Sequence, residues 1–149
     1  MIFKKLTINH LDSIYALCRS NLNYYHDCPP MVSKQSIIDD MNALPPNKQI
    51  SDKYYMGIYM NHQLVAILDY IYEYPNNKTN WIGFFMVDHA FKRKHIGKQI
   101  IEHIIKQSNH HLQLGVYENN LEAIKFWEAL GFKRIKQKAN ILIYEYQKN

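Results

Sequence analysis

The chain has 149 residues, of which 47% are apolar and 21% are charged, a composition typical of one globular domain rather than of a disordered or fibrous protein. Two cysteines, Cys18 and Cys28, are too few for a disulfide framework, and the longest apolar run, Leu64–Leu68, is far shorter than the ~20 residues of a transmembrane helix. No apolar stretch follows the first basic residues, so we expect no secretory leader, no membrane partner and a cytoplasmic location.

The basic residues are concentrated in the second half of the chain. The net charge is +5; residues 1–80 contain seven basic and seven acidic side chains, whereas residues 81–149 contain eleven and six. Such an excess predicts an anionic partner, which could be a nucleic acid, a membrane surface or a phosphorylated small molecule. A solvated charged face is the alternative.

The first 50 residues predict one strand and two helices. Ile2–Ile8 can form an edge strand, and apolar residues recur at helical spacing over Leu11–Leu22. Pro29-Pro30 stops any helix, Ser33 can cap a second one, and Pro45-Pro46 closes it.

The middle of the chain predicts antiparallel sheet. Lys53–Met60 and Leu64–Tyr74 are rich in Tyr, Ile and Val and are separated by a short polar turn. Trp81–Val87 follows a second turn and is almost entirely apolar, which predicts a strand buried on both faces.

The last third predicts two more helices and three strands. Asn119-Asn120 can cap the second helix, with Glu122 in a capping-box position, and Gly131 can end it in the left-handed conformation. The expected elements are a helix over Ile96–Ile105, a strand over Leu112–Tyr117, a helix over Asn120–Leu130 and strands over Phe132–Lys138 and Ile141–Tyr146. The order β-α-α-β-β-β-α-β-α-β-β predicts one mixed α/β domain over residues 1–149.

A basic loop joins the strand that ends at Val87 to the helix that begins near Ile96. The first turn of a helix has unpaired N–H groups and a partial positive charge, so an anion can bind there. Gly97 has no Cβ and would let that anion approach the backbone. The loop cations are Lys92, Arg93, Lys94 and Lys98. These features predict a phosphate-binding loop, with a solvated turn as the alternative; the glycine motifs of nucleotide-binding folds are absent.

Two segments resemble motifs of the GCN5-related N-acetyltransferase (GNAT) superfamily. Lys92-Arg93-Lys94-His95-Ile96-Gly97 corresponds to the family's acetyl-CoA loop, Q/R-x-x-G-x-G/A, with His95 in place of the first glycine. Asn120-x-x-Ala123-x-x-Phe126-Trp127-x-x-x-Gly131-Phe132 matches the second block at the family spacing. The resemblance implies the GNAT fold with a mostly antiparallel central sheet, acetyl-CoA as cofactor, and acetyl transfer to a primary amine of a small molecule or peptide by direct attack.

The resemblance also implies a set of cofactor contacts. The backbone of the strand ending at Val87 would polarise the thioester, the basic loop would bind the pyrophosphate, and the start of the later helix would contact the pantetheine arm. The implied cofactor-binding residues are Phe85, Met86, Val87, Lys92, Arg93, Lys94, His95, Ile96, Gly97, Lys98, Asn120, Ala123, Phe126 and Trp127.

The catalytic groups are less clearly marked. Trp127 stands where the family often has a tyrosine acid, and an indole N–H is far too weak an acid for that role. Either Tyr117 or Tyr144 protonates the leaving thiolate, or the thiolate leaves unprotonated. The candidate bases are Asp69 and Glu73, because both lie on an apolar strand where burial would raise a carboxyl pKa. A structural carboxylate is the alternative.

The first eighty residues contain nine of the twelve tyrosines and, by the resemblance, shape the acceptor site. The candidate acceptor-binding residues are Tyr24, Tyr25, Tyr70 and Tyr72, since aromatic rings attract a cationic amine; ordinary packing is the alternative.

The eight histidines include no His-x-His pattern and no i,i+4 pair on one helix, so we expect no metal site. The competing functions are a non-catalytic acyl-CoA-binding sensor on the same fold and a nucleic-acid-binding module, although we expect no nucleic-acid partner. Apolar sheet edges are compatible with a homodimer.

Overall fold

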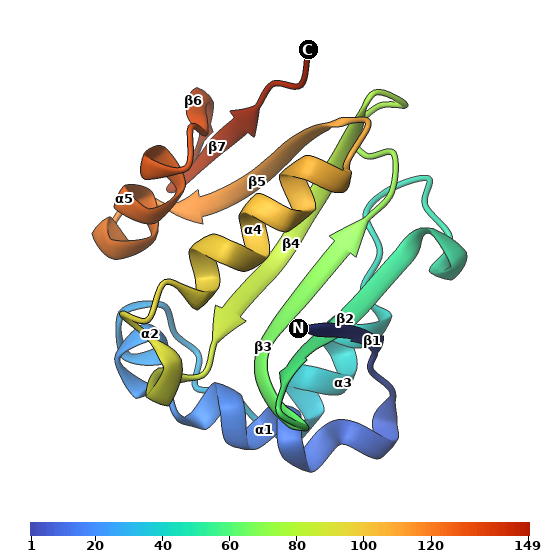
Figure 1. Ribbon diagram of the computed structural model, residues 1–149. Coiled ribbons are helices and arrows are strands. Elements are labelled where there is room, and N and C mark those ends of the chain that lie inside the picture. The colour runs from blue at the N-terminus through green and yellow to red at the C-terminus, as the bar shows by residue number, and fades with distance from the viewer.

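The computed structural model describes all 149 residues and contains one seven-stranded sheet in the order β1-β2-β3-β4-β5-β7-β6 (Figure 1). Neighbouring strands are antiparallel except β4 and β5, which are parallel. The strands are Ile2–Lys5 (β1), Lys53–Met60 (β2), Gln63–Ile71 (β3), Thr79–Val87 (β4), His111–Tyr117 (β5), Lys133–Lys138 (β6) and Ile141–Tyr146 (β7). The predicted mixed α/β class with a mostly antiparallel sheet is confirmed.

Five α-helices and three short 3-10 turns connect the strands. The helices are Leu11–Arg19 (α1), Leu22–Asp27 (α2), Lys34–Asn42 (α3), Ile96–Gln107 (α4) and Leu121–Ala129 (α5). The 3-10 turns are Ile8–His10, Ile50–Asp52 and His89–Phe91. None of the helices is both long enough and apolar enough to cross a membrane.

Helices cover both faces of the sheet, and the alternation of side chains along β3 separates the two cores. Ile67 packs with residues of α1 and α3 on one face. Leu68, the next residue, packs with residues of α4 and α5 on the other face. Every side chain on β3 therefore belongs to one face or the other.

The N-terminal third differs from the expected pattern. β1 ends at Lys5, because Thr7 caps the 3-10 turn that follows. The single helix expected over residues 11–22 ends at Arg19, and α2 begins at Leu22. Asn21, at this break, is buried and donates hydrogen bonds to the carbonyl oxygens of Leu17 (3.3 Å) and Val87 (3.0 Å). The junction of α1 and α2 is thus tied to the C-terminal end of β4.

The remaining differences concern strand ends and one cap. β3 ends at Ile71 rather than at residue 74, because the chain turns at Glu73, where φ is +55°. Asn120, not Asn119, caps α5 by accepting a hydrogen bond from the Ala123 N–H. Gly131 has the predicted left-handed conformation, with φ +97°. The expectation that β4 is buried on both faces is wrong, because Gly83 is exposed in a groove.

Candidate active site

β4 and β5 pair over only part of their lengths. Residues 79–82 of β4 pair with residues 111–114 of β5. Beyond this point, β4 continues to Val87 beside β3 alone, and β5 continues to Tyr117 beside β7 alone. Figure 1 shows the two strands diverging toward their C-terminal ends. The peptide groups of β4 that face β5 beyond Ile82 have no strand partner, so they are available to a bound molecule.

A groove of about 610 Å³ lies at this divergence, a volume within the range of small-molecule sites. We call it the β4–β5 groove. Its walls are β4, the end of β5 and the start of α5 on one side, and α2, residues 28–32 and α3 on the other. Among the predicted site residues, the groove is lined by Tyr24, Tyr25, Asp69, Phe85, Tyr117, Asn120, Ala123 and Trp127.

The basic loop before α4 has an unusual backbone. Arg93 and His95 both adopt positive φ angles, +64° and +60°. His95 is the N-cap of α4 but makes no side-chain hydrogen bond to the helix, so the first-turn N–H groups remain available. The left-handed conformation at His95 is one that glycine adopts most readily. The histidine therefore keeps the backbone shape of a glycine loop at a cost of ~1–2 kcal/mol.

Two of the four loop cations have a partner within the protein. Lys92 Nζ lies 3.7 Å from a carboxylate oxygen of Glu122, which links the loop to α5. Lys94 Nζ lies 5.5 Å from the centre of the Phe91 ring. Arg93 and Lys98 form no ion pair. The loop thus retains a net positive charge next to the free N–H groups of α4.

Gly97 lies where α4 packs closely against β4 and α5. A Cβ at this position would lie 3.3 Å from both Phe126 Cε1 and Val87 Cγ2. The sequence had suggested that the missing Cβ leaves room for an anion. The structure shows that it lets α4 approach β4 and α5, and this approach sets where the N-terminus of α4 lies.

Trp127 belongs to an aromatic cluster between α5 and the sheet. Its ring centre lies 6.0 Å from that of Phe85, 4.9 Å from that of Phe126 and 5.0 Å from that of Phe132. The side chain is buried, yet it also lines the β4–β5 groove. Trp127 is therefore part of the core and part of the groove wall.

Asp69 lies in the groove opposite an irregularity in β4. Asp69 pairs with Phe84, but the next residue, Tyr70, pairs with Ile82, so Gly83 is an extra, bulged residue. A Cβ on Gly83 would lie 3.1 Å from Asp69 Oδ2. The glycine therefore provides the space that the carboxylate occupies.

The Asp69 carboxylate is held on one oxygen only. Lys53 Nζ donates a hydrogen bond to Oδ2 at 3.1 Å, whereas Oδ1 is buried and has no partner. Asp69 is 8% exposed. Burial raises the pKa of Asp69 above its usual 3.8, and the Lys53 ammonium opposes part of that rise.

Lys53 is a residue that the sequence analysis did not single out. Its ammonium also donates to the backbone carbonyls of Asp40 and Ala43, at the C-terminal end of α3. Strand alternation could have identified it. Lys53 and Tyr55 are buried and Tyr54 is exposed, so Lys53 occupies an inward position of an apolar strand, where a lysine needs a buried partner.

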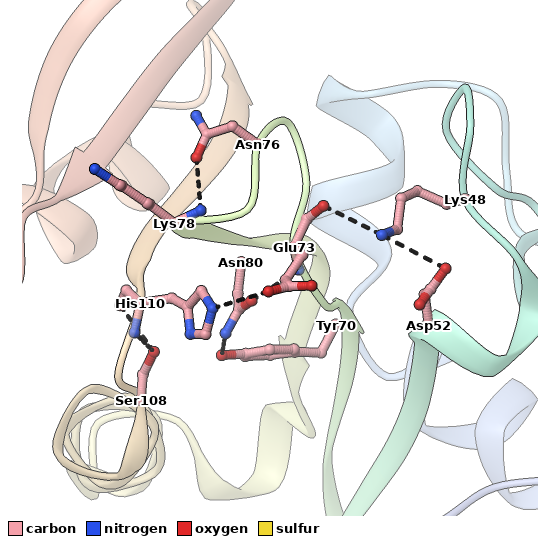
Figure 2. A network of polar contacts seen from close by, with 9 residues as sticks. All are labelled: Lys48, Asp52, Tyr70, Glu73, Asn76, Lys78, Asn80, Ser108 and His110. Atoms are coloured by element: carbon pink, nitrogen blue, oxygen red, sulfur yellow. Dashed lines mark hydrogen bonds and ion pairs between the residues drawn. The ribbon is translucent and has the colours of Figure 1, made fainter.

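The structure places several other candidates outside the groove. Glu73 Oε2 lies 3.4 Å from His110 Nε2, and the Glu73 carbonyl accepts a hydrogen bond from Lys48 (Figure 2). The Tyr70 hydroxyl accepts from Asn80 at 2.8 Å. Tyr70 and Tyr72 line a separate cavity of about 280 Å³, next to the C-terminal end of α4. The geometry brings none of these three predicted residues to Asp69.

The two candidate acids are also separated. Tyr117, on β5, lines the groove. Tyr144, on β7, is buried, and its hydroxyl donates to Glu128 Oε2 at 2.8 Å. Tyr144 is absent from the groove lining, so Tyr117 is the one of these two tyrosines that lines the groove.

The family model described as "Acetyltransferase (GNAT) family" matches residues 17–132, which include the basic loop, both diverging strands and α5. The chain belongs to the GNAT family. Solved acetyltransferase structures share the fold of this chain over nearly its whole length. An acetyltransferase from Thermus thermophilus superposes with a TM-score of 0.85 at 15% identity, covering 98% of this chain and 97% of that one. At such identity the likeness shows the fold alone.

Three further comparisons concern proteins that are named for an activity. The PaiA N-acetyltransferase from Thermoplasma acidophilum, solved in complex with coenzyme A, has a TM-score of 0.73 at 17% identity, with 99% and 98% of the chains covered. The spermine/spermidine N(1)-acetyltransferase of Bacillus subtilis is 27% identical over 88 residues, which are 52% of this chain and 58% of that protein. The N-alpha-acetyltransferase 30 of Dictyostelium discoideum is 34% identical over 86 residues, 53% and 45% of the two chains. The chain thus spans about half the length of the curated relatives it matches.

Proposed function

We propose that this GNAT chain transfers an acetyl group from acetyl-CoA to a primary amine of a small molecule or peptide. The observation that carries the proposal is the β4–β5 groove. It contains β4 peptide groups that have no strand partner and the buried carboxylate of Asp69, one of whose two oxygens has no hydrogen-bond partner. Relatives named as a spermine/spermidine N(1)-acetyltransferase and an N-alpha-acetyltransferase support an amine acceptor. Both cysteines are free, which supports a reducing, cytoplasmic location.

The residues present fit coenzyme A. The free N–H groups of α4, with Arg93 and Lys98 beside them, suit its phosphates. The backbone of β4 near Phe85, Met86 and Val87 has no strand partner on the β5 side and suits the amide groups of its arm, except that the Val87 carbonyl already accepts a hydrogen bond from Asn21. Asn120, Ala123 and Trp127 would form the wall on the α5 side. When bound, acetyl-CoA supplies the activated acetyl thioester.

Asp69 is the group best placed to take a proton from the acceptor amine. An ammonium group cannot attack a carbonyl, so its proton must be removed. Asp69 Oδ1 has no hydrogen-bond partner in the structure, and burial raises the Asp69 pKa toward the range that a general base needs. Asp69 would take the proton of the ammonium and pass it to solvent. As the nitrogen–carbon bond forms and the carbon–sulfur bond breaks, the nitrogen would lose a second proton and the sulfur would gain one, so that the thiol is released with one net proton. Tyr117 is the groove residue that can protonate the sulfur.

An acetyl-CoA turnover screen tests the proposal. We expect release of CoA with at least one member of a panel of polyamines, arylalkylamines, aminoglycosides and short peptides. Asp69→Asn should lower kcat by at least ~100-fold, in the range of general-base catalysis, without weakening CoA binding. Glu73→Gln is the matched control, because Glu73 lies outside the groove. Tight CoA binding with no turnover on the whole panel would contradict the proposal and favour the non-catalytic sensor, for which the tryptophan at position 127 is the supporting observation.

A further inference from the structure

We infer that the acceptor is an amine that carries no carboxylate or phosphate beside its amino group, an inference that rests on the proposed function. The evidence is the sign of the charges in the β4–β5 groove. The only charged side chains that line it are Asp40 and Asp69. No lysine, arginine or histidine lines the groove, so an acceptor carboxylate would meet the Asp40 carboxylate and the Asp69 carboxylate already paired with Lys53, and no free cation.

The one nearby ammonium cannot serve as a partner. The Lys53 side chain is only 3% exposed. An ammonium group has three N–H donors, and those of Lys53 are used by Asp69 Oδ2 and by the carbonyl oxygens of Asp40 and Ala43. Binding an anion at Lys53 would require breaking one of these buried bonds. The cation therefore neutralises Asp69 and leaves nothing for a ligand.

The acceptor side of the groove is otherwise aromatic. The rings of Tyr24 and Tyr25 meet edge to face with centres 4.9 Å apart, and Tyr24 lies 6.5 Å from Phe84. Burial raises the pKa of Tyr24 to about 12, because a desolvated site disfavours any charge that has no partner. Ring faces attract cations, and the Asp40 and Asp69 carboxylates are partners for a cation but not for an anion. The groove thus suits a positive amine with an apolar body.

Asp40 is the group whose charge should set this selectivity at the rim. It lies at the C-terminal part of α3, is exposed, and forms no ion pair through its own carboxylate. Its neighbour Asp39 accepts a hydrogen bond from Gln35 and does not line the groove. The two adjacent aspartates on one helix therefore provide a test residue and a matched control.

The experiment compares acceptors that differ only by the anionic group. We would measure kcat/KM by CoA release for phenethylamine, phenylalanine and phenylalaninamide, and for putrescine and ornithine. We expect each free amino acid to be at least ~30-fold poorer than its decarboxylated partner, which corresponds to about 2 kcal/mol. Phenylalaninamide has the bulk of the amino acid without its negative charge, so it should approach phenethylamine. The same comparison is made for the best acceptor of the screen and its carboxylated counterpart.

Each outcome decides the inference. Asp40→Asn should lower severalfold the ratio of kcat/KM for the amine to kcat/KM for the corresponding amino acid. Asp39→Asn should leave this ratio unchanged. Equal or better use of free amino acids would overturn the inference while leaving acetyl transfer intact. If phenylalaninamide were as poor an acceptor as phenylalanine, the inference would also be overturned, because the groove would then exclude the added bulk rather than the negative charge. Failure of every amine to release CoA would instead overturn the proposed function.

Discussion

Replacing Lys53 by glutamine tests the assignment of Asp69 as the base. The ammonium lies 3.1 Å from Asp69 Oδ2, and two unit charges at that distance attract by about 5 kcal/mol at an effective dielectric constant of ~20. Water that enters the variant would screen part of this loss. Opposite charges this close usually lower a carboxyl pKa by ~1–3 pH units. Glutamine removes the charge but can still donate to the carbonyls of Asp40 and Ala43.

The sign of the effect follows from the two causes of the Asp69 pKa. Burial raises it and Lys53 opposes the rise, so Lys53→Gln should raise it further. Because the base must be ionised, the acid limb of the kcat/KM profile should move ~1–3 units toward higher pH. The assay is CoA release from pH 5.5 to 9.5 with a saturating cofactor.

The control is Lys48→Gln. Lys48 also pairs with an aspartate, Asp52 at 3.5 Å, but lies outside the groove. This variant should keep the wild-type acid limb. If Lys53→Gln is folded and active with an unshifted limb, then Asp69 is a structural carboxylate and not the base.

Three further predictions concern the same region. Gly83→Ala places a Cβ 3.1 Å from Asp69 Oδ2, so kcat should fall ~10-fold or more while CoA affinity, measured by calorimetry, stays within twofold; a normal kcat would show that the carboxylate position is unimportant. Because the folded-state pKa of Asp69 is raised above 3.8, the stability it contributes is present below pH 3.8 and is lost as the pH rises through the folded pKa. The free energy of unfolding, measured in urea from pH 3.5 to 7, should therefore decline less with rising pH in Asp69→Asn than in the wild type. Parallel plots of this free energy against pH would contradict the prediction. Gly97→Glu should abolish CoA binding in calorimetry, since it adds a negative charge where phosphate would bind and a Cβ 3.3 Å from Phe126; circular dichroism must show a folded chain, and unchanged affinity would refute the loop assignment.

The fold could be predicted from local patterns because strong local signals mark most element ends. Ser33 caps α3 through the Ser36 N–H, and Gly131 ends α5 in the left-handed region. The α1–α2 break could not be predicted, since it depends on Asn21 reaching Val87, 66 residues away. Long-range contacts of this kind leave no mark in a local window.

The sequence named residues of β4, β5 and α5 that line the β4–β5 groove, and it also named Glu73, Tyr70 and Tyr72, which lie elsewhere. Along β3, strand alternation indicates that the side chains of Asp69 and Tyr70 point to opposite faces, and the two residues line different cavities. The partnership of Asp69 with Lys53 needed the register of β2 against β3, in which Tyr55 lies opposite Asp69. That register includes a shift between Ile58 and Tyr59, which the sequence pattern does not reveal.

The strongly basic edge of the sheet has a consequence for how copies of this chain can meet. Four of the six residues of β6 are Lys or Arg, every residue of β6 is exposed, and none of these cations forms an ion pair. The opposite edge, β1, ends in Lys4-Lys5. Strand addition between copies would set like charges side by side, which resists edge-to-edge polymerisation. The expectation of apolar sheet edges is therefore wrong for β6, and a homodimer of this chain would be expected to avoid this edge. The β6 cations also lie outside the β4–β5 groove.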